Sequence, residues 1–235
     1  MEAQPGVNPW ADDRILLIRK EMKMKIIKNK KYLIISVIVL LGIFSLYYAG
    51  SREDKAEHYY LLGKAYESQG YFEKAKDSYE NSVESKPDSI VYNALGNLYE
   101  YLGDNIEAID AFQKGIKADK DDIETYFDLG RVYINLREYS KAEETLFLII
   151  EKDNESASTY ALLGTVYIET NKWSLAEDYL TKSLSLQERA STYNDLGVVY
   201  ENMGNYGLAI ESYEHALMID FDFELARNNL ERLQN

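Results

Sequence analysis

Apolar and polar residues follow a fixed frame from Ala56 almost to the C-terminus. A Leu-Gly pair recurs five times, at spacings of 33, 34, 34 and 33 residues. One Tyr stands three residues before each of these Leu residues, and a second Tyr stands four residues after it. Because residues three and four apart share a face of a helix, this set predicts a helix with one apolar face. The five pairs are Leu62-Gly63, Leu95-Gly96, Leu129-Gly130, Leu163-Gly164 and Leu196-Gly197.

Each copy of the frame also predicts a turn and a second helix. A Gly inside a helix costs about 1 kcal/mol, so we expect the Gly of each pair to admit a neighbouring helix at close range. An Ala lies 13 residues after each Leu, where only a small side chain fits a helix crossing. The expected turns are at Gly70, Gly103, Arg137, Asn171 and Gly204. The Ala residues are Ala75, Ala108, Ala142, Ala176 and Ala209, and large apolar side chains follow at Tyr79, Phe112, Leu146, Leu180 and Tyr213.

This frame resembles the tetratricopeptide repeat (TPR), a unit of 34 residues that forms a helix, a turn and a helix. Such units stack because one unit alone cannot bury its apolar face. The resemblance covers residues 56–223 and implies an all-α TPR solenoid, a right-handed superhelix of helix-turn-helix repeats. The tail, residues 224–235, resembles the helix that caps a last repeat, so eleven helices are expected. The expected units are 56–88, 89–122, 123–156, 157–189 and 190–223.

The segment before the repeats follows another pattern. Residues 32–50 carry no charge, and about 20 apolar residues suffice to span a bilayer. The pattern predicts a single transmembrane helix at 32–50 after a basic segment at 1–31. A buried core helix and a cleaved signal peptide are the alternatives. Met22 and Met24 are alternative starting points of the chain.

The charges around this segment predict its orientation. Residues 1–50 carry eight Lys or Arg and four acidic residues, all before the apolar stretch. Positive residues beside a span remain in the cytoplasm. We therefore expect a single-pass membrane protein with its N-terminus in the cytoplasm and its repeats in a periplasm-like or extracellular space. The alternative leaves the repeats in the cytosol.

Composition excludes several kinds of chemistry. The chain of 235 residues has no Cys and a formal net charge of −14, which argues against thiolate sites and nucleic-acid binding. Its two His residues, His58 and His215, lie far apart without partners at metal-ligand spacing. No glycine-rich phosphate loop is present. We expect no catalytic residue, metal, cofactor or small-molecule substrate, and hence no enzyme.

The TPR resemblance implies a binding function instead. In this family the first helix of each unit lines a concave groove that holds a partner polypeptide. The acidic repeats favour a protein or peptide of basic or mixed charge. Asp128, Leu162 and Asp195 stand where the carboxylate-clamp and Asn-ladder types of TPR need other residues, so neither mode is expected. The predicted groove residues are Tyr60, Lys64, Glu67, Asn93, Asn97, Glu100, Tyr101, Glu124, Phe127, Arg131, Asn135, Thr165, Asn194, Val198 and Asn202.

The sequence thus favours a membrane-anchored TPR adaptor or scaffold. The alternative is a structural subunit of a larger membrane-attached assembly, docked by its convex face or its ends. The second helices, for example "AKDSYENSVESK", carry many polar residues, which favours the adaptor.

Overall fold

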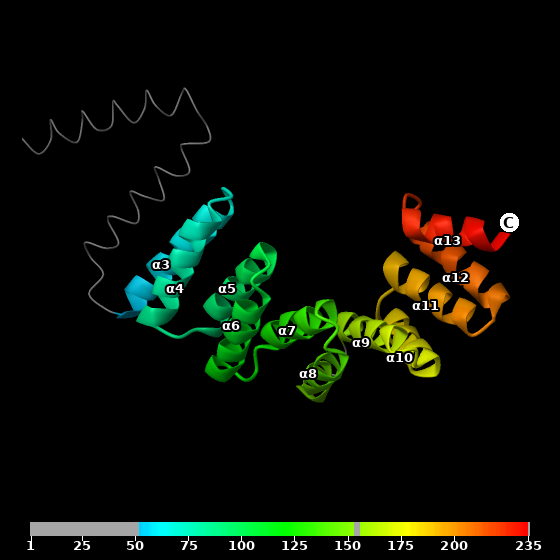
Figure 1. Cartoon of the computed structure of the whole chain (residues 1–235), viewed down its shortest axis with the longest axis horizontal. Helices are drawn as coiled ribbons and strands as arrows, with labels where there is room; N and C mark the ends of the chain where they lie inside the picture. Colours follow the sequence, from blue (N-terminus) through cyan, green and yellow to red (C-terminus); the bar gives the residue numbers. More distant parts are fainter. Residues whose placement is uncertain (1–51, 153–155, 235) are drawn as a thin grey trace, which may run out of the picture. The chain divides into compact units, whose positions relative to one another are not determined.

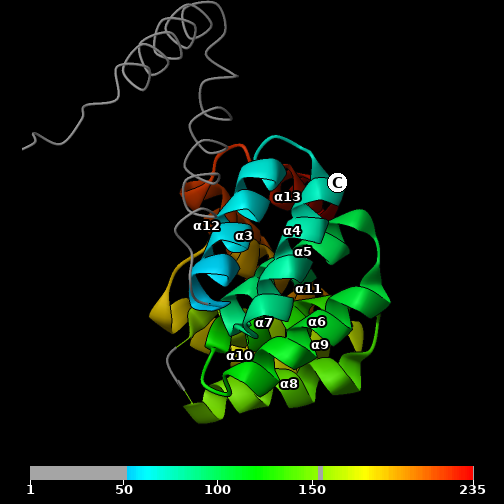
Figure 2. The same cartoon turned by 90° about the vertical axis from the view of Figure 1, so that its left-hand side faces the viewer.

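The computed structural model describes residues 52–152 and 156–234. The chain divides into two compact units, residues 1–86 and 87–235, and each is considered by itself. In the first unit, α3 (Arg52–Glu67) and α4 (Phe72–Ser85) pair as a helical hairpin (Figures 1 and 2).

The described part of the second unit contains nine helices. They are α5 (Ser89–Leu102), α6 (Asn105–Ala118), α7 (Ile123–Asn135), α8 (Tyr139–Lys152), α9 (Ala157–Glu169), α10 (Trp173–Leu186), α11 (Ala190–Asn202), α12 (Tyr206–Ile219) and α13 (Glu224–Gln234). With α3 and α4 these make the eleven helices predicted from the sequence. The predicted all-α TPR solenoid is therefore confirmed, and no strand occurs in residues 52–152 or 156–234.

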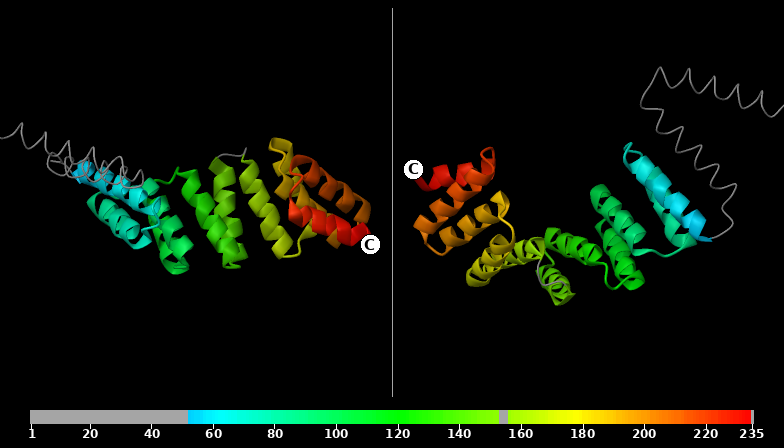
Figure 3. Two further views of the ribbon diagram at one scale, coloured as in Figure 1. Left: turned by 90° about the horizontal axis from the view of Figure 1, so that it is seen from above. Right: turned by 180° about the vertical axis from the view of Figure 1, so that it is seen from behind.

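Helix starts and helix pairs both follow from the sequence. The side chains of Asp88, Asp122 and Ser156 each accept a hydrogen bond from a backbone N–H in the first turn of α5, α7 and α9. Consecutive helices then pair as hairpins, and α13 packs against α12 (Figure 3). The first helices of the pairs also touch one another, α5 with α7, α7 with α9 and α9 with α11. This places one long face of the second unit on α5, α7, α9 and α11.

The repeated apolar positions form the core as predicted. All five Ala residues of the frame have no exposed surface. The Gly of each Leu-Gly pair lies against the large side chain of the second helix, because a Cβ on Gly96 would come within 2.6 Å of the Phe112 ring. A Cβ on Gly164 would lie 2.5 Å from Leu180 Cδ2. Carbon atoms pack no closer than about 3.5 Å, so only Gly permits this approach.

The turns between paired helices share one backbone conformation. Gly70, Gly103 and Gly204 have φ of 75°, 86° and 79°. Arg137 and Asn171 occupy the same place in their pairs with φ of 60° and 56°. Glycine is suited to this left-handed conformation, whereas Arg137 carries a Cβ that clashes with the backbone.

Arg137→Gly is therefore expected to stabilise the protein. The left-handed conformation costs a side-chain-bearing residue about 1–2 kcal/mol, and the extra chain entropy of Gly offsets part of that gain. We expect the free energy of unfolding to rise by about 0.5–1 kcal/mol in chemical denaturation. Gly103→Ala, the reverse change at the equivalent turn, should lower it, and equal effects of the two variants would contradict the account.

The predicted localisation needs correction. The helices of residues 52–152 and 156–234 are 11 to 16 residues long, and none is long and apolar enough to cross a bilayer, which takes about 20 residues. This contradicts the prediction of a single-pass membrane protein with its repeats outside the cytoplasm. The predicted span at 32–50 and the basic segment at 1–31 lie outside the described residues.

Candidate functional site

A polar cluster joins the first helices α5 and α7. Asp128 Oδ2 on α7 accepts hydrogen bonds from the side-chain amides of Asn93, at 2.8 Å, and Asn97, at 3.0 Å, both on α5. The amide of Asn97 also donates to Asn93 Oδ1 at 3.0 Å. Asn93 is buried, whereas Asp128 and Asn97 keep part of their surface in solvent. These contacts fix α5 against α7 and orient both amides.

Arg131 completes this cluster one turn further along α7. Its guanidinium donates to Glu100 Oε1 at 2.6 Å, to Asp128 Oδ1 at 3.1 Å and to Asn97 Oδ1 at 3.2 Å. Asn135 donates to the same Glu100 oxygen at 3.1 Å. Burial alone would lower the pKa of Arg131, but the bonds to the two carboxylates raise it above its usual value. We call these six residues the α5–α7 polar cluster: Asn93, Asn97, Glu100, Asp128, Arg131 and Asn135.

The same arrangement recurs between α11 and α13. Asn229 donates to Asn194 Oδ1 at 3.0 Å, and Arg232 binds the carboxylate of Glu201 through both terminal nitrogens. The sequence separations are again 35 and 31 residues, as for Asn93 with Asp128 and for Glu100 with Arg131. The hydrogen bonds from Arg232 lower the pKa of Glu201, despite the opposing effect of burial.

The stretch between these two polar junctions is more apolar. Phe127 of α7 and Leu162 of α9 are partly buried and pack on the main core cluster. Val198 of α11 packs on the second core cluster with α12 and α13. Thr165 turns its hydroxyl to the Ala161 carbonyl oxygen of its own helix, at 3.2 Å. The first helices thus show polar junctions at both ends and apolar side chains between them.

One carboxylate interrupts this apolar stretch. Asp195 on α11 is partly buried, and the hydrogen bond to its side chain is a long one, 3.4 Å, from the Asn194 amide. No cation of the described residues forms an ion pair with it. Burial raises the pKa of Asp195 to about 6, and the Asn194 amide only partly opposes this.

Other predicted groove residues have individual surroundings. In the first unit, Glu67 accepts a hydrogen bond from the Tyr79 hydroxyl at 2.6 Å, and the Lys64 ammonium lies 5.5 Å from the ring centre of Tyr60. In the second unit Tyr101 and Glu124 are exposed. The amide of Asn202 donates to the carbonyl oxygen of Val198 in its own helix.

Sequence reasoning missed Asp128 and Asp195 as site residues. Both occupy the position directly before a Leu-Gly pair, which was considered only for known TPR binding modes. The sequence does distinguish the two positions. In the repeat before Asp128, the residue two before the Leu is Asn93, which carries an amide. In the repeat before Asp195, the same position holds Ala161, which has no polar side chain. No group of three or more potential metal ligands occurs in residues 52–152 and 156–234.

The comparisons with known proteins agree with this architecture. The tetratricopeptide repeat family matches residues 47–121, 101–164 and 190–223. The chain therefore contains tetratricopeptide repeats, as the sequence frame and the helical hairpins both indicate. No curated protein matches it.

Several solved structures share the fold. MamA from Desulfovibrio magneticus RS-1 is 21% identical with a TM-score of 0.65, covering 77% of this chain and 98% of its own. A thermophilic TPR protein of Thermus thermophilus, TTC0263, is 19% identical with a TM-score of 0.60, covering 76% and 98%. YrrB, described as a TPR protein with an unusual peptide-binding site, is 20% identical with a TM-score of 0.61, covering 88% and 96%. At these identities the likeness concerns the fold alone.

Proposed function

We propose that this protein is a non-enzymatic adaptor that binds a partner polypeptide on the face formed by α5, α7, α9 and α11. This surface is called the first-helix face below. The observation that carries the proposal is the α5–α7 polar cluster, in which amides and a guanidinium are held in fixed positions at the edge of solvent. Arg131 keeps 36% of its side chain exposed within this cluster. Oriented polar groups beside apolar side chains suit a polypeptide with both polar and apolar groups.

The composition of the face supports a partner of basic or mixed charge. The formal net charge of the whole chain is −14, which attracts cations. Within the α5–α7 polar cluster, Asp128 and Glu100 provide two negative charges against the one positive charge of Arg131. YrrB, a TPR protein of similar fold, is described as having a peptide-binding site. We also propose that the repeats divide into five units, residues 56–88, 89–122, 123–156, 157–189 and 190–223.

Charge reversal on the first-helix face is expected to weaken partner capture. Glu124 of α7 is exposed on this face and takes no part in the α5–α7 polar cluster, so Glu124→Lys leaves the cluster intact. We expect at least a three-fold loss of bound partner when the full-length chain is immobilised and exposed to a lysate of the source organism. The bound proteins are identified and quantified by mass spectrometry, and melting temperature is compared in parallel.

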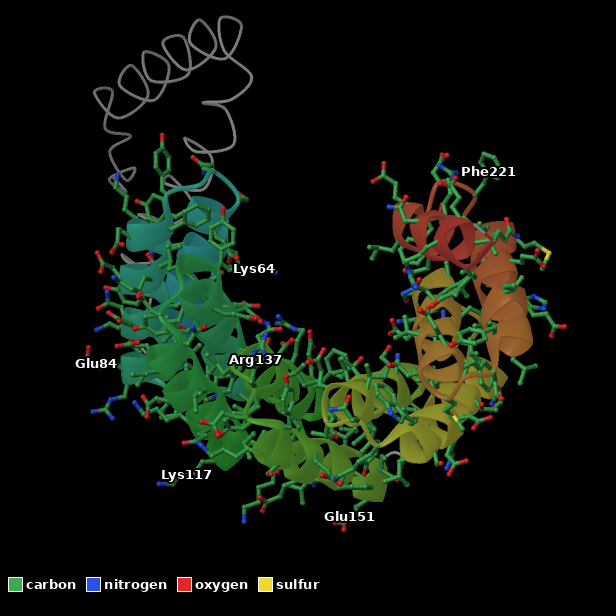
Figure 4. All side chains as sticks on the ribbon, turned by 45° about the vertical axis from the view of Figure 1, so that its right-hand side comes forward. Lys64, Glu84, Lys117, Arg137, Glu151 and Phe221 are labelled. Carbon is green, nitrogen blue, oxygen red and sulfur yellow. The ribbon has the colours of Figure 1, made fainter. Side chains whose placement is uncertain are left out.

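The matched control is Glu151→Lys. Glu151 is an exposed residue of α8 that points away from the ribbon (Figure 4), and its replacement changes the net charge by the same amount. The proposal expects a set of proteins that is retained by Glu151→Lys and lost with Glu124→Lys. Equal losses with both variants would indicate attraction by net charge alone and contradict it.

A second candidate is a structural subunit that docks by α12 and its flanking turns. This part of the second unit exposes large apolar side chains, including Met218 at 70% and Phe221 at 78% of their surface (Figure 4 labels Phe221). Tyr206 and Leu208 at the start of α12 are also exposed, at 58% and 44%. Met218→Lys with Phe221→Lys should abolish association under this candidate and leave capture unchanged under the adaptor proposal.

A further inference from the structure

The junction between α9 and α11 differs from the polar junctions at α5–α7 and α11–α13. On α5 and α7, the carboxylate before the Leu-Gly pair, Asp128, has an arginine three residues later and two amides facing it from the preceding first helix. Asp195 occupies the same position on α11. Three residues later stands Val198, and the positions facing it on α9 hold Ala161 and Thr165. Asp195 therefore lacks each of the groups that neutralise Asp128.

Neighbouring helices do not supply the missing charge. On α12 the Tyr213 hydroxyl donates to Glu201, at 3.1 Å. On α13 the guanidinium of Arg232 is held by the same Glu201. On α10, Glu177 interacts with Tyr200 of α11 and is itself an acid. Asp195 is thus a carboxylate without a cation, next to the partly buried Val198, and burial holds its pKa well above the usual value.

An isolated carboxylate in partly apolar surroundings is costly unless a cation pairs with it. We propose that Asp195 accepts a cationic side chain, arginine or lysine, from a partner polypeptide that lies on the first-helix face between α9 and α11. The pairing of Asp128 with Arg131 shows, within the same chain, the contact that the partner supplies. This inference rests on the proposed function and specifies the chemistry of its ligand.

The occupant has a defined character. Apolar contacts are offered by Val198 of α11 and Leu162 of α9, both partly buried. The segment that fits this surface therefore carries a basic residue flanked by apolar residues. A segment with an acidic residue at that place would meet Asp195 with like charge and be rejected.

Two variants test this inference without knowledge of the natural partner. Asp195→Asn keeps the shape of the side chain and removes its charge. Val198→Arg places a guanidinium three residues after Asp195, as Arg131 stands three residues after Asp128. The new arginine should pair with Asp195 and so block the partner's cation. Thr181→Arg adds the same charge at an exposed position of α10 and serves as the matched control.

The first measurement uses synthetic peptides and the full-length chain. One set of fluorescein-labelled peptides carries a single arginine among apolar residues. Its affinity is compared with that of otherwise identical peptides in which glutamine replaces the arginine. We expect the wild type and Thr181→Arg to bind arginine peptides about ten-fold more tightly than the glutamine peptides. Asp195→Asn and Val198→Arg should lose this preference. Equal affinity for both peptides in the wild type, or an undiminished preference in Asp195→Asn, would overturn the inference.

The second measurement needs no peptide. The pKa of the Asp195 carboxyl is followed by carbon-13 NMR in the wild type and in Val198→Arg. A fall of at least one pH unit in the variant is expected. An unchanged value would overturn the inference, because it would show that a guanidinium on this face does not reach the carboxylate. These outcomes are independent of the capture experiment with Glu124→Lys. That experiment can support the proposed function while the tests at Asp195 contradict this inference, and the reverse is also possible.

Discussion

Gly130→Trp is expected to destabilise the protein by about 3 kcal/mol, because a close helix crossing leaves no room for a side chain. A Cβ on Gly130 would already lie 2.9 Å from Cδ2 and 3.1 Å from Cγ of Leu146. Leu146 is fully buried in the main core cluster and cannot turn aside without displacing its neighbours. A large ring at this position must therefore push α7 and α8 apart. The measurement is the free energy of unfolding from chemical denaturation followed by circular dichroism.

The control for this prediction is Gly207→Trp. Gly207 lies in α12 and is exposed, and a Cβ there would meet no atom within 4 Å. The same substitution should change the free energy of unfolding by less than about 1 kcal/mol. If the two variants unfold alike, the packing role assigned to the Leu-Gly frame is wrong.

Asp195→Asn is expected to stabilise the free protein at pH 7.5 by about 3 kcal/mol. Burial raises the pKa of this carboxyl to about 6 from an ordinary value of 3.8. A carboxyl whose pKa is raised in the folded state contributes stability below the ordinary value, and this contribution is lost as the pH rises through about 6. The charged side chain thus costs stability at neutral pH, whereas the amide of Asn does not titrate. The gain should be full above about pH 7 and absent below about pH 4.

Asp128→Asn provides the contrast at the equivalent position. This substitution removes the ion pair with Arg131. It also removes the negative charge of the carboxylate that accepts hydrogen bonds from the two amides of α5. It should destabilise the protein at pH 7.5 by about 1 kcal/mol, since Arg131 is partly screened by solvent. Thermal unfolding of both variants at pH 4 and pH 7.5 tests the pair. Destabilisation by Asp195→Asn at pH 7.5 would show that its charge is already satisfied in the free protein.

A residue that reduces stability in the free protein needs another reason for its presence. Binding surfaces often contain such groups, because a partner supplies the compensating charge. Asp195 fits this pattern, whereas Asp128, at the equivalent position two helix pairs earlier, is neutralised within the chain.

The repeated frame was sufficient to predict the helices, their turns and the core. The Tyr, Leu, Gly and Ala positions recur five times, so packing roles could be assigned without a structure. The left-handed turns at Arg137 and Asn171 were also located, because they align with Gly70, Gly103 and Gly204. Their strain was not predicted, since sequence position alone does not give the sign of φ.

The candidate site was predicted only in part. Asn93, Asn97, Glu100, Arg131 and Asn135 were recognised as groove residues, but they were treated as free to meet a partner. The structure shows that they bond to one another across α5 and α7, some through Asp128 and others directly. Such contacts depend on which side chains of adjacent helices come into register, at separations of 31 and 35 residues. The repeated frame identifies the residues that pack in the core. It does not tell which polar side chains of adjacent helices form hydrogen bonds with each other.

The predicted localisation failed for a different reason. It was drawn from the composition of residues 1–50, and the described helices offer nothing long and apolar enough to cross a bilayer. The repeat frame and the N-terminal pattern are independent signals, so the confirmation of one carried no weight for the other.

Site-specific photocrosslinking tests the central claim, that a polypeptide binds the first-helix face, most directly. Benzoylphenylalanine is introduced in living cells at Glu124 on α7, at Glu151 on α8 and at Met218 on α12, all of which are exposed. The account predicts a covalent adduct with a partner polypeptide from the Glu124 position and none from the Glu151 and Met218 positions. Adducts from Glu151 or Met218 with none from Glu124 would contradict it.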